Sequence, residues 1–141
     1  MSVLVWIEQS QEGAVASSWE LAAKGRELAD ALGGSLDAVV MGAATDVATA
    51  AAQTYGFDTV YTITDPVLEN YRLSAYAAGL KQAVEASGAS VILASATTRG
   101  RELTAFVACQ LGAGLAPDAV DLRIEDGKLV AVRSVYSNNI L

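Results

Sequence analysis

The amino-acid sequence predicts an α/β domain: a doubly wound, mostly parallel sheet with helices on both faces, and an antiparallel hairpin late in the chain. Three observations lead to this fold class. Short, continuous apolar runs recur between residues 3 and 94, as in strands that are buried on both faces. Amphipathic stretches with helical spacing separate these runs. Beyond Pro117 the pattern becomes strict alternation on either side of Asp126-Gly127, a strong hairpin signal.

The size and composition of the chain suit one domain. It has 141 residues, of which 52% are hydrophobic and 18% are charged, so it can bury a core. No linker or low-complexity tract divides the sequence. We therefore expect residues 1–141 to form a single α/β domain.

Four apolar runs are the expected parallel strands, and they span residues 3–7, 36–41, 59–63 and 91–94. The first helix is expected to begin at Ser17, which stands three residues before Glu20 in the spacing of a capping box. Gly33-Gly34 should end this helix. Its expected inward side chains are Leu21, Ala22, Gly25, Leu28, Ala29 and Leu32.

Three more helices follow the same cycle. One runs from Asp46 toward Gly56, the next from Leu73 toward Gly88, and the last ends at Gly112. The expected inward side chains are Val47, Ala48, Ala51 and Tyr55 in the first of these, Leu73, Tyr76, Ala77, Leu80 and Val84 in the second, and Leu103, Phe106, Val107 and Leu111 in the third. The stretches 9–13 and 65–72 are expected to be irregular connections, and residues 120–124 and 129–136 the strands of the hairpin.

Charge and residue usage exclude several classes of function. The formal net charge is −7 and no cluster of Lys and Arg occurs, so neither nucleic acid nor a membrane surface is an expected partner. The absence of histidine removes the commonest general base and metal ligand. The single cysteine, Cys109, cannot form an internal disulfide, which favours a cytoplasmic setting. The apolar opening of the chain is short and lacks a basic leader, so we interpret it as a strand and not as a signal peptide.

Ligands of open α/β sheets collect at the carboxyl ends of the strands. Four loops are expected there, at residues 8–16, 42–45, 64–71 and 95–101, and the last is the most informative. Ser95-Ala-Thr-Thr-Arg-Gly-Arg101 combines hydroxyls, guanidinium groups and a glycine at a helix N-terminus, which suits an anion. The structural alternative is the more common one in proteins, because Ser and Thr cap helices and Gly eases a turn. We hold this loop as a candidate anion or interface site, made of Thr97, Thr98, Arg99, Gly100 and Arg101.

No catalytic constellation emerges from the remaining candidates. Cys109 has no histidine to activate it and is expected to be a buried or half-buried structural thiol. The acidic residues Asp118, Asp121, Glu125 and Asp126 are scattered around a turn and favour a solvated rim over a metal site. Neither a Walker motif nor the dinucleotide Gly-x-Gly-x-x-Gly is present. We predict no catalytic residue and no metal site.

Four motifs in order resemble the N-terminal domain of the electron transfer flavoprotein alpha subunit. They are SATTRGREL at 95–103, QLGAGLAPD at 110–118, EDGKL at 125–129 and RSVYSNN at 133–139. The front half agrees, with a first strand ending in Glu8, then Asp65-Pro66 and Tyr71. The family usually has Arg-Pro-Val-Tyr and a Gly-Asn-Ala turn where this chain has Ser134 and Asn138, so it resembles a divergent member.

The resemblance implies an electron carrier and not an enzyme. Such alpha subunits form heterodimers with a beta subunit and pass on electrons from acyl-CoA and other dehydrogenases. FAD is held mainly by a C-terminal domain, expected beyond this chain, and AMP by the beta subunit. The N-terminal domain has an adenine nucleotide alpha hydrolase-like fold, packs on the beta subunit and supports the FAD domain, so no cofactor-binding residues are expected here.

Two further expectations stand beside this one. The last residues turn through Asn138-Asn139 and restart with Ile140-Leu141, so we expect a truncated chain whose end opens a strand beside 129–136. The alternative function is a stand-alone nucleotide-binding domain of the universal-stress type, which would use the 97–101 loop for phosphate, although that family's glycine spacing is not present.

Overall fold

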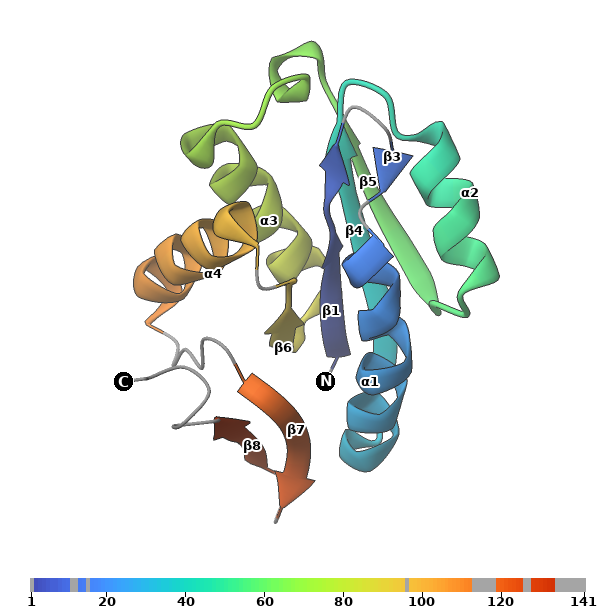
Figure 1. Cartoon of the computed structure of the whole chain (residues 1–141), viewed down its shortest axis with the longest axis vertical. Helices are drawn as coiled ribbons and strands as arrows, with labels where there is room; N and C mark the ends of the chain where they lie inside the picture. The colour runs from blue at the N-terminus through green and yellow to red at the C-terminus, as the bar shows by residue number, and fades with distance from the viewer. Residues whose placement is uncertain are drawn as a thin grey trace.

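The computed structural model describes residues 2–10, 13–14, 16–95, 97–112, 119–125 and 128–133. Its centre is a parallel sheet with the strand order β5-β4-β1-β6 (Figure 1). The strands are β1 (Ser2–Ile7), β4 (Ser35–Gly42), β5 (Thr59–Thr64) and β6 (Ala89–Leu93). Each lies where the sequence predicts a strand, with ends shifted by one or two residues, and the expected α/β class is confirmed.

β1 is one of the two central strands of the sheet, and like β4 it has a neighbour on both sides. Val3 pairs with Leu36 of β4 and with Val91 of β6. Every residue of β1 is buried. A strand covered on both faces needs apolar side chains at odd and even positions alike, which explains the continuous run in the sequence.

Helices cover both faces of the sheet in two pairs (Figure 1). α1 (Ala16–Leu32) and α2 (Asp46–Thr54) lie on one face, and α3 (Leu73–Ser87) and α4 (Thr98–Leu111) on the other. Alternate side chains of β1 divide between the two layers: Val5 packs in the core with Leu28, and Leu4 in the core with Leu80 and Leu103. Burying each such side chain contributes about 1.5–3 kcal/mol.

The start of α1 differs from the expected one. The helix begins at Ala16, so Ser17 lies inside its first turn and the predicted capping box is wrong. The Ser17 hydroxyl donates instead to Ser95 Oγ at 2.9 Å, a long-range partner that local sequence cannot reveal. The other end is as predicted, because Gly33 follows the helix with a φ of 68°, where a side chain would be strained.

The inward face of α2 is rotated from the predicted one. Ala48 and Ala52 are buried, whereas the Val47 side chain is 83% exposed and Tyr55 is half exposed. Small alanines let the helix approach the sheet closely, and this determines its rotation more than the single valine does. Tyr55 is held at the surface by stacking on Trp19, with ring centroids 4.7 Å apart.

The inward face of α4 is only partly as predicted. Leu103 and Val107 are fully buried, but Phe106 and Leu111 are each more than one third exposed. Four residues separate Leu103 from Val107, so they share one narrow stripe of the helix, and Phe106 lies one residue off it.

Several short elements lie in stretches where the sequence indicates only loops. β2 (Gln9–Ser10) and β3 (Gly13–Ala14) pair antiparallel inside the stretch expected to be irregular, so that expectation is wrong in part. The 3-10 helix η1 (Pro66–Leu68) follows Asp65, whose Oδ1 accepts a hydrogen bond from Val67 N at 2.9 Å.

The expected antiparallel pairing of the hairpin is confirmed up to residue 133, and residues 134–136 of the expected second strand lie outside the described part. β7 (Ala119–Glu125) pairs antiparallel with β8 (Lys128–Arg133), with Ile124 opposite Leu129. The Asp126-Gly127 turn and the expected extra strand at Ile140-Leu141 lie outside the described residues.

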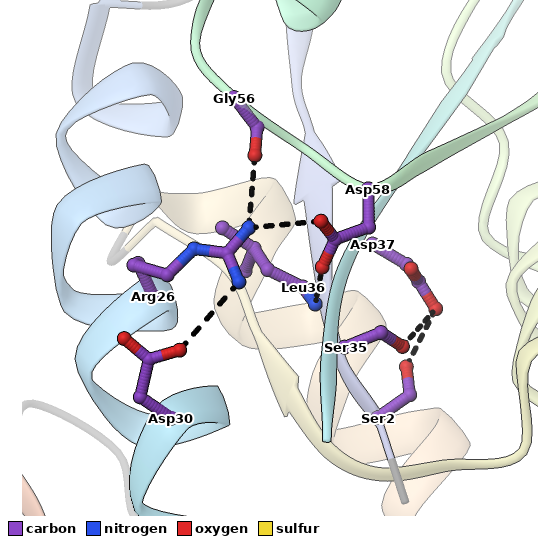
Figure 2. Close-up of polar contacts among 8 residues, drawn as sticks. All are labelled: Ser2, Arg26, Asp30, Ser35, Leu36, Asp37, Gly56 and Asp58. Atoms are coloured by element: carbon purple, nitrogen blue, oxygen red, sulfur yellow. Dashed lines mark hydrogen bonds and ion pairs between the residues drawn. The ribbon is translucent and has the colours of Figure 1, made fainter. Parts of the chain in front are cut away.

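Polar contacts join the elements at the amino ends of the strands (Figure 2). The Arg26 guanidinium on α1 donates to Gly56 O at 3.0 Å and to Asp58 Oδ1 at 3.2 Å, and it lies 3.7 Å from Asp30. The second oxygen of Asp58 accepts a hydrogen bond from Leu36 N at 2.9 Å. This network ties α1 to the loop before β5 and to the start of β4.

Candidate functional site

The strand order reverses between β1 and β6, which marks the place where a ligand site is expected. The chain runs outward from β1 to β4 and β5, and then returns to place β6 on the other side of β1. Loops that leave β1 and β6 therefore diverge and open a crevice at the carboxyl ends of these strands. Glu8 follows β1 directly, and Ser95 and Thr97 follow β6.

Glu8 is a buried carboxylate at this point, with only 6% of its surface exposed. Its Oε1 accepts a hydrogen bond of 2.6 Å from Thr97 Oγ1, and its backbone N donates to Ser18 Oγ at 3.0 Å. Ser95 joins the same group through Ser17. The first residues after β1 and β6 are thus tied to each other and to the first turn of α1.

The predicted loop 97–101 begins α4, but its groups do not all face one site. Thr97 caps the helix, since its Oγ1 accepts a hydrogen bond from Gly100 N at 3.0 Å. Gly100 is buried, and a Cβ there would collide with the backbone carbonyl of Ser95. Both residues are therefore needed to join β6 to α4. Thr98, Arg99 and Arg101 are exposed, and of these Arg99 lines the cleft described next.

A cleft of about 890 Å³ opens beside Glu8 at the carboxyl edge of the sheet. Its lining comes from the ends of β1 and β4, the η1 loop, and the first turns of α3 and α4. The residues are Glu8, Gln9, Met41, Gly42, Ala43, Ala44, Leu68, Glu69, Asn70, Tyr71, Tyr76 and Arg99. This volume lies within the range of small-molecule sites in proteins.

Aromatic rings form one wall of the cleft. The Arg99 guanidinium lies over the Tyr71 ring, 5.2 Å from its centroid, and the rings of Tyr71 and Tyr76 have centroids 5.1 Å apart. Tyr71 donates its hydroxyl to Glu102 at 3.0 Å, and Tyr76 donates to Leu68 O at 2.6 Å. Burial and then the Glu102 carboxylate raise the pKa of Tyr71 to about 12, so its ring stays neutral. Burial also raises the pKa of Tyr76.

All four loops expected at the carboxyl edge contribute residues to the cleft lining, but sequence reasoning gave Glu8 no role. A signal for Glu8 was present, because a charged residue directly after a buried strand lies at the carboxyl edge of the sheet. Gly42 and the two alanines after it have no side-chain signature at all. Tyr71 and Tyr76 both line the cleft, and Tyr76 is also buried in the core, as its place on the predicted inward face of the helix indicates.

Cys109 differs from its prediction, because it is an exposed residue of α4 and not a buried thiol. The acidic residues expected to form a rim near the hairpin have side chains that lie outside the described part. Within the part of the chain that the structure describes, no group of three or more His, Cys, Asp or Glu side chains could hold a metal ion. None of the helices described there combines the length and apolar character needed to cross a membrane.

Comparison with known proteins gives one consistent family. The family model of the electron transfer flavoprotein domain matches residues 3–141. Protein FixB of Azorhizobium caulinodans is 40% identical over 143 residues, which cover 99% of this chain and 39% of that protein. Electron transfer flavoprotein subunit alpha of Thermoanaerobacterium thermosaccharolyticum is 31% identical, with 97% of this chain and 42% of that protein covered.

These relatives share nearly all of the present chain, and the chain spans about two fifths of their length. The parallel sheet flanked by two helix layers agrees with the fold that the resemblance implied. The chain therefore belongs to the electron transfer flavoprotein domain family, as an N-terminal domain of the alpha-subunit type.

Proposed function

We propose that this chain is the N-terminal module of an alpha-type electron transfer flavoprotein subunit, and that its work is to hold a beta subunit and to support an FAD domain. The observation that carries the proposal is the family match over residues 3–141 together with alpha-subunit and FixB relatives. In this role the whole protein takes electrons from dehydrogenases in the cytoplasm. The module itself is a scaffold without a reaction of its own.

The residues of the cleft do not fit the FAD of such a protein. A pyrophosphate would face the carboxylates of Glu8 and Glu69, with Arg99 as the only cation in the lining. Like charges at a shared site repel strongly where water is partly excluded. We therefore propose that FAD is held outside residues 1–141. As the family resemblance implies, AMP is expected in the beta subunit.

Co-expression with a beta subunit tests the scaffold role. We expect a tagged form of this chain to retain an electron transfer flavoprotein beta subunit through size-exclusion chromatography as a one-to-one complex. Glutamate substitutions at two exposed apolar side chains, Val47 on α2 and Phe106 on α4, then locate the contact. These two helices lie on opposite faces of the sheet, so one variant should lose the complex and the other serve as its matched control. Failure to retain the beta subunit in any arrangement would contradict the proposal.

A nucleotide-binding module of the universal-stress type is the second candidate, and the observation in its favour is a cleft at the carboxyl edge of the sheet beside the end of β1. Calorimetry with ATP and AMP distinguishes the two functions. Micromolar binding that disappears in Arg99→Ala and Arg101→Ala would support a phosphate site in the 97–101 loop. We expect no heat of binding instead, since the Glu8 carboxylate already lies against the Thr97 hydroxyl at the start of α4.

A further inference from the structure

Glu8 has a buried carboxyl group that forms no ion pair with a Lys or Arg of the described residues. It is 6% exposed, and Thr97 supplies the one hydrogen bond that its carboxylate accepts from the part of the chain described here. Buried carboxylates in proteins are normally paired with a cation, because an uncompensated charge away from water is costly. Since Glu8 also lines the cleft, a positive group could reach it from there.

We propose that the cleft binds a small, flat organic cation of the amidinium or guanidinium class, with Glu8 as the residue that selects its charge. A planar cation can place two N–H groups on one carboxylate and its flat face against a ring. The cleft offers both features, because the carboxylate of Glu8 and the rings of Tyr71 and Tyr76 border the same space.

The protein itself shows that this aromatic wall accepts such a group. The Arg99 guanidinium is stacked over Tyr71 at 5.2 Å, within the usual range of a cation–π contact. The Tyr71 hydroxyl is held by the Glu102 carboxylate, which orients the ring and adds a negative charge behind it. Arg99 is exposed, so its side chain can leave the ring when a ligand arrives.

The charge balance of the lining favours the same class of ligand. Glu8 and Glu69 are the two carboxylates of the lining, and Arg99 is the one cation. A phosphate or carboxylate ligand would meet repulsion from both acids, whereas a cation gains attraction from both.

Three probes of one shape and different charge test the proposal: benzamidine, benzamide and benzoate. We expect isothermal calorimetry of the unaltered chain to show binding of benzamidine about tenfold tighter than benzamide, and benzoate weaker than both. In Glu8→Gln, which keeps the size and the acceptor for Thr97, this preference should fall to within about threefold. Equal affinities for the first two probes in the unaltered chain, or no binding of benzamidine up to millimolar concentration, would overturn the proposal.

Three variants complete the test. Glu85→Gln removes the same charge from an exposed position of α3 outside the cleft lining and should leave the tenfold preference unchanged. Arg99→Gln should tighten benzamidine severalfold, because the competing guanidinium leaves Tyr71. Glu69→Gln should weaken the binding of benzamidine, because it removes one of the two carboxylates of the cleft lining. The side chains of Arg99 and Glu69 are both exposed, so these two variants should fold even if Glu8→Gln does not. Weaker binding of benzamidine in Arg99→Gln together with tighter binding in Glu69→Gln would refute the proposal.

Discussion

At the scale of single residues, Gly100 shows how tightly the loop after β6 is built. Its Cα lies against the backbone carbonyl of Ser95, and a methyl group there would collide with atoms that cannot rotate away. The Thr97 hydroxyl also lies near the same position, because it accepts the hydrogen bond of Gly100 N. The glycine of the predicted anion loop is therefore explained by packing.

Replacing Gly100 by alanine should destabilise the fold by about 1–3 kcal/mol, because α4 must move away from the loop after β6. Urea denaturation followed by circular dichroism measures this change. Gly79→Ala is the matched control: its Cβ would meet Met41 Sδ at 2.6 Å and Ile63 Cδ1 at 3.3 Å, the ends of side chains that can shift. We expect a smaller loss there, and an equal loss would show that the carbonyl of Ser95 is not the obstacle.

Asp58 gives a residue-scale prediction about pH. Its hydrogen bond from Leu36 N, followed by the Arg26 guanidinium, lowers the pKa of its carboxyl below the ordinary value of 3.8. The folded state thus binds a proton less readily than the unfolded chain does. The stabilisation is present above about pH 4 and is lost as the pH falls through the lowered pKa.

Asp58→Asn should therefore cost about 1 kcal/mol at neutral pH, a modest value because the pair is exposed. This difference should shrink as the pH falls below 3.8 and vanish once the pH is below the lowered pKa of Asp58. Urea midpoints measured from neutral to acid pH for both proteins check this. Asp30→Asn serves as the control, since Asp30 lies at 3.7 Å from Arg26 and should matter less. A difference that stays constant down to the lowest pH would argue against the charge contribution.

At the scale of elements, α2 is the case where side-chain size determines the rotation of a helix. Ala48 and Ala52 face the core with 3% and 0% exposure, while Val47 points to solvent. The valine was expected inside because it is the most apolar residue of the helix. Two alanines at a spacing of four residues bring the helix closer to β5 than a face that includes valine could.

Exchanging the two residue types one at a time tests this rotation. Val47→Ala should change the free energy of unfolding by less than about 0.5 kcal/mol, because an exposed position loses little and alanine favours the helix. Ala48→Val adds two methyl groups to a filled core and should cost about 1–3 kcal/mol. Thermal melts of the two variants decide the matter, and the opposite ranking would place Val47 inside as the sequence suggested.

At the scale of the whole molecule, the periodicity of the sequence predicted the helices and strands, but it could not predict which distant side chains come into contact in the fold. The four parallel strands, four helices and the hairpin follow from apolar spacing, since burial on one or two faces leaves a period in the sequence. The pairing of Glu8 with Thr97 or Ser17 with Ser95 joins residues far apart in the chain, and no local pattern records it. The candidate cleft is assembled from such long-range neighbours, so the sequence indicated the loops that contribute to it and not its shape.

The place of β1 in the sheet has a consequence for how the chain is made. Ser2 of this first strand pairs with Ser35 on one side and with Ala89 on the other. A ribosome therefore releases the centre of the sheet first and its last neighbour much later. The edge of β1 that pairs with β6 has to wait for about ninety residues to be synthesised, several seconds at ordinary rates of translation. The order of the strands makes the nascent chain a natural client of chaperones during that interval.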